Sequence, residues 1–352
     1  MERDEAFHRT LVNETRKMIG GHLALADFMS LYIETRARQE LPRFWSEITF
    51  KSKQVPDSGS QLDRWHRMRT SFWIEMLVEF EFAKTLSPII SAYTVMEEMY
   101  AYALIDDVQY RLLLNETTRA MTAVAFGVDN SSDRHESLSE ALDILPLQSA
   151  IGFSDSNEVR KQLLQHAVDA IVAQGIGTVN QRKLARKADV STSMIAYHFS
   201  DMATFLNEAI WHALIQDIPD DLDPDREDAE MPETMSEWFA TLNRYVSPPF
   251  DTKPAGFYTA FARLTGQACL LTKFQPALHP LVQYLRSLEG WGTYRVGQHI
   301  HSRGAVIHRD HAAAFGLWIK AEGALREAGL VDVGRDACDI AEAARLILPP
   351  FD

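Results

Sequence analysis

The sequence predicts an all-α protein, and three observations lead to that fold class. Proline and glycine are sparse inside long amphipathic stretches, and the alternating pattern typical of strands is scarce. The segment RKLARKADVSTSMIAYHF, residues 182–199, has the pattern of two short helices joined by a tight turn. Two further segments, far apart in the chain, resemble each other. The prediction is therefore a helix-turn-helix unit flanked by two helical-bundle domains.

Length and charge limit what the chain can do. Its 352 residues exceed one ordinary domain, so two or three units are expected. The net charge of −14 argues against nucleic-acid binding over the whole surface, because phosphate contacts need a positive footprint. A locally basic module remains compatible with that charge.

Cysteine usage and the first residues bear on location. Cys269 and Cys338 are the two cysteines, and they form neither a disulfide framework nor a zinc-binding spacing. The first residues, MERDEAFHRT, do not resemble a signal peptide, and no apolar run is long enough to span a bilayer. We expect a cytoplasmic protein without a membrane partner.

The predicted boundaries follow two polar segments. Residues 1–135 form a first helical domain, 136–157 a linker, 158–212 the helix-turn-helix domain, and 213–352 a second helical domain. The run between residues 217 and 233 holds nine carboxylates against Arg226 alone. Such a run is expected to be a solvated loop, rather than the metal site that it could also suggest.

The repeat supports the two flanking domains. TLSPIISAYTVMEEMYAY, which begins at Thr85, aligns with ALHPLVQYLRSLEGWGTY, which begins at Ala277. The aligned pairs are Leu86 with Leu278, Pro88 with Pro280, Ile89 with Leu281, Ile90 with Val282, Glu97 with Glu289, and Tyr102 with Tyr294. A fainter match aligns Phe7 with Phe205. The chain is interpreted as two copies of one helical domain, in which the two glutamates are surface or pairing residues.

The central unit can be built helix by helix. The first helix has one apolar face, formed by Leu163, Leu164, Ala167, Val168, Ile171 and Val172, and it ends at Gly175 and Gly177. Thr178 is the expected cap of the second helix. That helix turns Leu184, Ala185 and Ala188 inward.

The turn and the last two helices follow. Asp189 lies at the turn, where a positive φ is often needed and aspartate tolerates it. Ser191 is expected to cap the third helix, which Ile195 and Phe199 anchor. Ser200 is expected to cap a fourth helix, whose buried stripe is Phe205, Leu206, Ala209, Ile210 and Leu214.

This unit has the chemistry of a DNA-binding module. The third helix exposes Thr192, Ser193, Ala196, Tyr197 and His198. The second helix carries Arg182, Lys183, Arg186 and Lys187. Residues 158–200 contain six Lys or Arg and three Asp or Glu, a local charge of about +3 in an acidic chain.

The segment VNQRKLARKADVSTSMIAYHFSDMATFLNEAI resembles the DNA-binding domain of TetR-family transcriptional regulators over about 50 residues, 160–210. The matching positions are Thr178, Leu184-Ala185, Ala188-Asp189-Val190-Ser191, and Tyr197-His198-Phe199. Three positions depart from the family pattern. Asp189 replaces a glycine, Ala196 replaces a tyrosine, and Asp201 stands near the usual place of a lysine. The missing lysine removes one expected phosphate contact.

The resemblance implies a function and its residues. Family members carry a helical C-terminal domain that binds a small effector and dimerises. The resemblance therefore implies a repressor that binds a double-stranded DNA operator as a homodimer and is controlled by a small-molecule effector. The implied DNA-binding residues are Thr178, Arg182, Lys183, Arg186, Lys187, Ser191, Thr192, Ser193, Tyr197 and His198. The alternative is a degenerate regulator that sequesters a partner protein without binding an operator. Two copies in one chain could also pair with each other, with one DNA-binding unit between them.

The remaining candidates are weaker. Aromatic residues at helical spacing could line an effector pocket or belong to the ordinary core: Phe257, Tyr258, Phe261, Trp291 and Tyr294. The histidines of GQHIHSRGAVIHRDH, namely His299, His301, His308 and His311, are interpreted as ordinary surface or pocket residues rather than metal ligands. No phosphate loop, nucleophile elbow, dinucleotide fingerprint or zinc-protease motif is found. Neither catalysis nor a metal or cofactor is expected.

Overall fold

The computed structural model describes residues 1–15, 22–50, 59–127, 138–142, 157–215, 218–220, 222–223, 226, 230–246, 256–300, 307–330 and 339–350. Helices are the regular structure throughout these ranges, and no strand occurs in them. The predicted all-α class is confirmed.

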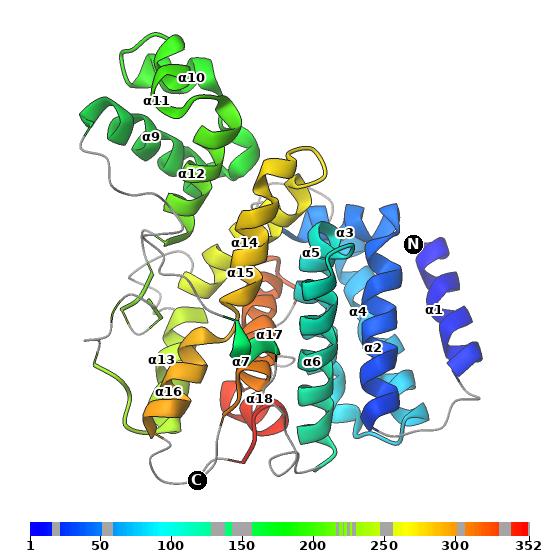
Figure 1. Cartoon of the computed structure of the whole chain (residues 1–352). Coiled ribbons are helices and arrows are strands. Elements are labelled where there is room, and N and C mark those ends of the chain that lie inside the picture. The colour runs from blue at the N-terminus through cyan, green and yellow to red at the C-terminus, as the bar shows by residue number, and fades with distance from the viewer. Residues whose placement is uncertain are drawn as a thin grey trace.

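The helices before the central unit form the N-terminal half of the body (Figure 1). They are α1 (Glu2–Thr15), α2 (His22–Ala37), α3 (Glu40–Phe50), α4 (Gly59–Glu79), α5 (Ser87–Leu104), α6 (Val108–Ala125) and the short α7 (Leu138–Ala141). Helix α7 lies inside the segment 136–157 that the sequence predicted as a linker, and residues 143–156 lie outside the described ranges.

Four helices form a unit that projects from the body in Figure 1, here called the head. They are α9 (Glu158–Gln174), α10 (Gln181–Lys187), α11 (Ser193–Phe199) and α12 (Met202–Ile215). The C-terminal half of the body follows, with α13 (Met235–Val246), α14 (Phe257–Leu271), α15 (His279–Ser287), α16 (Trp291–Ile300), α17 (Arg309–Glu327) and α18 (Ile340–Ile347).

The two halves of the body share one core. Helices α5 and α17 are buried at nearly every position, as expected for helices surrounded by other helices. Helix α5 packs on α2 and α4 of its own half and on α14, α15 and α17 of the other half. The halves are therefore joined by apolar packing as well as by the chain.

The repeat found in the sequence is accompanied by a repeat of helix boundaries. A 3₁₀ turn, Lys84–Leu86, leads directly into α5, and a second one, Pro276–Leu278, leads directly into α15. Each helix has a proline in its first turn, where the missing N–H removes no helical bond. The preceding helices, α4 and α14, end at Glu79 and Leu271, which are separated by the same 192 residues as Leu86 and Leu278.

The correspondence fails after this point. Helix α5 continues to Leu104, whereas α15 stops at Ser287 and α16 starts at Trp291. Gly290 lies in the break with a φ of +71°, and a Cβ there would lie 1.9 Å from the Ala312 carbonyl oxygen of α17. Only glycine fits this close approach to α17.

Helices α1 and α12 have equal length but different surroundings. Helix α1 buries one stripe, Asp4, His8, Val12 and Thr15, against the body. Helix α12 buries seven residues because it packs on α9 of the head and on α14 of the body. The outer side of α1 is mostly polar, with Glu2, Arg3, Arg9, Asn13 and Glu14 exposed.

No helix within the described ranges combines the length and apolar character needed to cross a lipid bilayer.

Candidate nucleic-acid interface

The head is built on α9. Asn157 caps this helix, since its side chain accepts a hydrogen bond from the Arg160 backbone N–H. The predicted apolar face is buried at Leu163, Leu164, Ala167, Val168 and Ile171. Gly175 ends the helix with a φ of +94°, a conformation that favours glycine. Packing of this stripe against α12 forms the core of the head.

The predicted role of Thr178 as a helix cap is wrong. Thr178 ends a 3₁₀ turn, Ile176–Thr178, and its hydroxyl donates to the Gly175 carbonyl at 2.7 Å. Asn180 caps α10 instead, and its side-chain oxygen accepts from the N–H groups of Arg182 and Lys183. The 3₁₀ turn displaces the helix start by two residues, which a pattern of residue types does not reveal.

The turn between α10 and α11 agrees with the sequence. Asp189 has a φ of +53°, and the Val190 N–H donates to the Ala185 carbonyl at 2.9 Å. This bond satisfies a carbonyl at the end of α10. An aspartate therefore occupies the left-handed position that glycine usually fills.

Helix α11 presents the predicted exposed face. Ile195 and Phe199 are buried, while Thr192, Ser193, Ala196 and Tyr197 are exposed, and Tyr197 exposes 79% of its surface. His198 is only half-exposed, and its Nε2 is buried without a hydrogen bond among the described residues. Tyr197 is therefore the more accessible side chain of the two.

The predicted capping roles of Ser191 and Ser200 are wrong. Ser191 exchanges a hydrogen bond with Ser193 at 2.7 Å, and the N-cap position of α11 belongs to Thr192. Ser200 has a φ of +66°, while Asp201 accepts a hydrogen bond from the Thr204 N–H at 2.7 Å at the start of α12. Asp201 thus stabilises the helix, close to where the resemblance leads one to expect a lysine.

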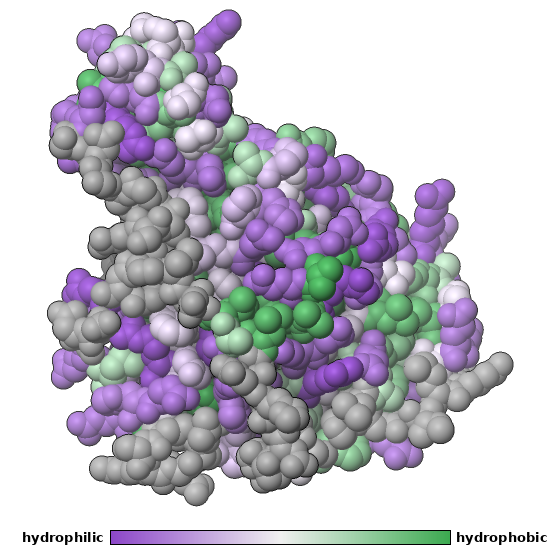
Figure 2. All heavy atoms as spheres, in the orientation of Figure 1, coloured by the Kyte–Doolittle hydropathy of each residue, from purple (hydrophilic) through white to green (hydrophobic). Residues whose placement is uncertain are grey.

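The basic side chains lie on the exposed side of α10. Arg182, Lys183, Arg186 and Lys187 are all exposed. The Nζ of Lys187 lies 3.4 Å from a carboxylate oxygen of Asp169 on α9. The hydrogen bond from Gln165 lowers the pKa of Asp169 most, and the contact with Lys187 lowers it further. Figure 2 shows the visible surface of the head as mainly hydrophilic, which suits contact with a charged polymer.

Two residues of α14 attach the head to the body. Arg263 donates to the Val172 carbonyl of α9 at 3.0 Å. The Gln267 side chain accepts from the Ile176 N–H at 2.9 Å and donates to the carbonyl of Phe50, the last residue of α3, also at 2.9 Å. Gln267 therefore contacts both the head and the N-terminal half. Nothing in the sequence pattern singled out either residue.

A buried polar cluster joins the two halves. Glu97 and Glu289 are both buried, so they are not surface residues. Arg286 donates to Glu97 at 3.1 Å across the halves, and Tyr100 and Lys320 donate to Glu289. Burial raises the pKa of the Glu97 carboxyl, although the Arg286 guanidinium opposes the shift.

The aromatic residues predicted as an effector pocket fall into two groups. Phe257, Tyr258 and Phe261 contact one another along α14, with the Phe257 and Phe261 rings 5.3 Å apart. Trp291 and Tyr294 contact each other on α16, and the Arg309 guanidinium lies over both rings. Two cavities described in the body are lined by other residues.

The histidines near the C-terminus have carboxylate neighbours. His308 Nδ1 lies 2.7 Å from a Glu140 oxygen of α7, and His311 lies 3.2 Å from Asp310. His301 lies outside the described residues. Within the described ranges, no three His, Cys, Asp or Glu residues are grouped as a metal site requires.

Comparison with known proteins gave no match to a family model, to a curated protein or to a solved structure.

Proposed function

We propose that the chain is a DNA-binding transcriptional regulator of the TetR type, in which α11 of the head enters the major groove. The observation that carries this proposal is the surface of the head. An exposed row of hydroxyl and phenol groups at the start and along the face of α11, with the half-exposed His198, stands beside an exposed basic helix, α10, in an otherwise acidic chain. Polar groups of this kind contact base edges, and basic ones contact phosphates.

The residues divide into these two roles. Thr192, at the N-cap of α11, and Ser193, Tyr197 and His198, on the helix itself, are assigned to bases or nearby phosphates. Thr178, Arg182 and Ser191 are assigned to the DNA backbone, with Lys183, Arg186 and Lys187 adding positive charge along α10. Thr178 is half-buried and donates within the head, so its contribution goes through the 3₁₀ turn that precedes α10.

One head contacts one half-site, which gives weak and poorly specific binding. We therefore propose that two chains bind an operator together, as a repressor that a small molecule releases. The contact between the two halves lies within each chain, so the second chain uses a different surface. Release requires that the effector change the free-energy difference between two arrangements of the heads.

The experiment is selection of random double-stranded DNA on the purified chain, followed by light-scattering mass with the selected DNA. Enrichment of a palindrome by a complex with two chains is the expected result. A single enriched half-site bound by one chain would reject the homodimer and retain DNA binding. Enrichment of nothing would reject DNA binding.

A second candidate is a regulator that sequesters a partner protein without binding DNA. The absence of the family's lysine at the start of α12 favours it, because Asp201, Met202 and Ala203 supply no cation there to contact phosphate. The exposed basic side chains of α10 favour DNA binding. The selection experiment separates the two, since a sequestration protein enriches no DNA sequence.

A further inference from the structure

One cavity lies where the two halves of the body meet. Its volume is about 510 Å³. The N-terminal half contributes Arg38, Glu40 and Arg43 from the α2–α3 region and Tyr102 and Ala103 from the end of α5. The C-terminal half contributes Thr272, Lys273, Pro276 and His279 after α14 and at the start of α15. A molecule in this cavity would therefore touch both halves.

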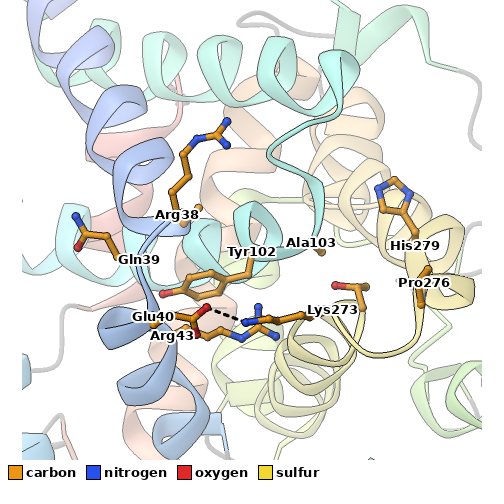
Figure 3. A pocket seen from close by; sticks show the side chains of 11 residues that line it. Arg38, Gln39, Glu40, Arg43, Tyr102, Ala103, Lys273, Pro276 and His279 are labelled. Atoms are coloured by element: carbon orange, nitrogen blue, oxygen red, sulfur yellow. Dashed lines mark hydrogen bonds and ion pairs between the residues drawn. The ribbon is translucent and has the colours of Figure 1, made fainter.

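The lining is cationic, although the chain as a whole is acidic. The lining holds three cations, Arg38, Arg43 and Lys273, against a single carboxylate, Glu40, and His279 adds an imidazole. Figure 3 shows Arg43, Lys273 and Glu40 meeting beside the Tyr102 ring, with His279 on another side of the cavity. Ala37, Ala103 and Pro276 add apolar surface. This combination suits a small organic anion rather than a bare inorganic ion.

The cations can exchange their present partners for a ligand. Lys273 lies 2.8 Å from Glu40, and Arg38 lies 3.3 Å from Asp106; both carboxylates are more than 80% exposed. Exposed pairs of this kind contribute little stability, because water screens them. Arg43 is held in place by its hydrogen bond to the Leu270 carbonyl of α14 and lies over the Tyr102 ring. The Nε of Arg43 also lies 3.6 Å from a carboxylate oxygen of Glu47, one turn further along α3. Arg43 is thus a positioned cation beside two exchangeable ones.

Two of the helices at the cavity, α3 and α14, are also joined to each other close to the head. Arg43 belongs to α3 and Lys273 follows α14. The last residue of α3, Phe50, and the head residue Ile176 both bond to Gln267 of α14. An anion that draws α3 and the end of α14 together acts on the helix that holds the head, α14, and on the helix bonded to it through Gln267.

From this geometry we propose that the cavity between the halves binds a small organic anion carrying a carboxylate or phosphate, and that this anion is the effector. The proposal rests on the proposed function for its regulatory part and names a site other than the aromatic one suggested by the sequence. The proposal that the cavity binds an anion does not depend on DNA binding.

The first test is calorimetric binding of citrate, and separately of inorganic phosphate, to the full chain at constant ionic strength. Saturable binding of citrate is expected. The variant R38Q/K273Q should weaken it at least tenfold, whereas K84Q/R119Q, which removes two exposed body cations outside the cavity, should leave it unchanged. E40Q should strengthen binding several-fold, because the competing carboxylate is removed. If the chain binds phosphate but not citrate, or binds neither probe, the organic-anion assignment is overturned. Equal loss in both double variants would reject this cavity as the site.

The second test measures affinity for the selected DNA with and without citrate. A change of threefold or more in the natural chain, absent from R38Q/K273Q, supports the effector role. Weaker DNA binding by R38Q/K273Q without citrate would mean that these cations contact DNA, and would reject that role. Citrate binding in a chain that binds no DNA retains the site and rejects the regulator. DNA binding by a chain that does not bind citrate rejects the site and retains the regulator.

Discussion

At the scale of one residue, a change at Tyr197 tests DNA binding without disturbing the fold. Its side chain is 79% exposed, so the variant Y197A should retain the stability of the natural chain. Loss of its contact with DNA should weaken operator binding about tenfold, in line with about 1–3 kcal/mol for a good base contact. Fluorescence anisotropy with the selected DNA measures the affinity, and urea unfolding measures the stability.

Phe199, two residues further along α11, is the buried aromatic residue used for comparison. Its ring lies 4.7 Å from the Phe205 ring and lies beneath the Arg160 guanidinium, inside the head. F199A should cost about 3–5 kcal/mol of stability, as buried phenylalanines usually do. Unchanged DNA binding in Y197A would contradict the assignment of α11 to the groove.

Three histidines make stability depend on pH. Burial lowers the pKa of His8 to about 3 and those of His66 and His212 to about 4, with nearby arginines adding to each shift. Because each folded pKa is below the unfolded value, the unfolded chain takes up these protons first as the pH falls. The free energy of unfolding should therefore decrease from about pH 6.5 downward, by up to about 2 kcal/mol per buried histidine at pH 5.

His66 and His212 contribute less than His8, because both are partly exposed. Urea unfolding at pH 7, 6 and 5 measures the effect. The triple variant H8Q/H66Q/H212Q should show a smaller decrease over that interval. An unchanged decrease would assign the pH dependence to other groups.

At the scale of elements, Gln267 of α14 holds the junction of head and body. Q267L removes its bonds to Ile176 and Phe50 and leaves the Ile176 N–H without its partner, at a cost of about 1–3 kcal/mol. Amide hydrogen exchange should become faster at residues 172–178 while the core of α17 stays protected. Q162L, a change on an exposed position of α9, is the control. Equal exchange in Q267L and the natural chain would reject Gln267 as an attachment point.

The helices of the head could be predicted from the sequence because local signals agree there. Apolar spacing placed α9 and α12, and Asp189 marked the turn. The capping residues could not be predicted in the same way, because Asn180 and Asp201 compete with Thr178 and Ser200 for neighbouring positions. The cationic cavity could not be predicted from the sequence either, because Arg43 and Lys273 are 230 residues apart in the chain.

At the scale of the whole molecule, the shared core predicts that the two halves unfold together. Arg286 and Glu97 lie in that core, 3.1 Å apart and both buried. R286M should cost about 3–5 kcal/mol, because it leaves the Glu97 carboxylate without its cation. R286M/E97M should recover much of that loss, because no charge stays buried alone.

Urea unfolding followed by tryptophan fluorescence and by circular dichroism measures both variants. One coincident transition is expected for the body in the natural chain and in the variants. Two separated transitions would show that each half is stable alone. Failure of the double variant to recover would show that the pair contributes more than charge balance.

The position of this pair across the two halves of one chain has a further consequence for how the protein can change over generations. In a symmetric dimer, one altered codon changes both sides of the contact at once. Here Glu97 and Arg286 come from separate parts of one reading frame, so each side can be altered singly. Covalent linkage also fixes the effective concentration of one half beside the other, so dilution to a few copies per cell does not separate them. The junction between the halves can therefore be an asymmetric surface, and the cavity has Arg43 on one side and Lys273 on the other.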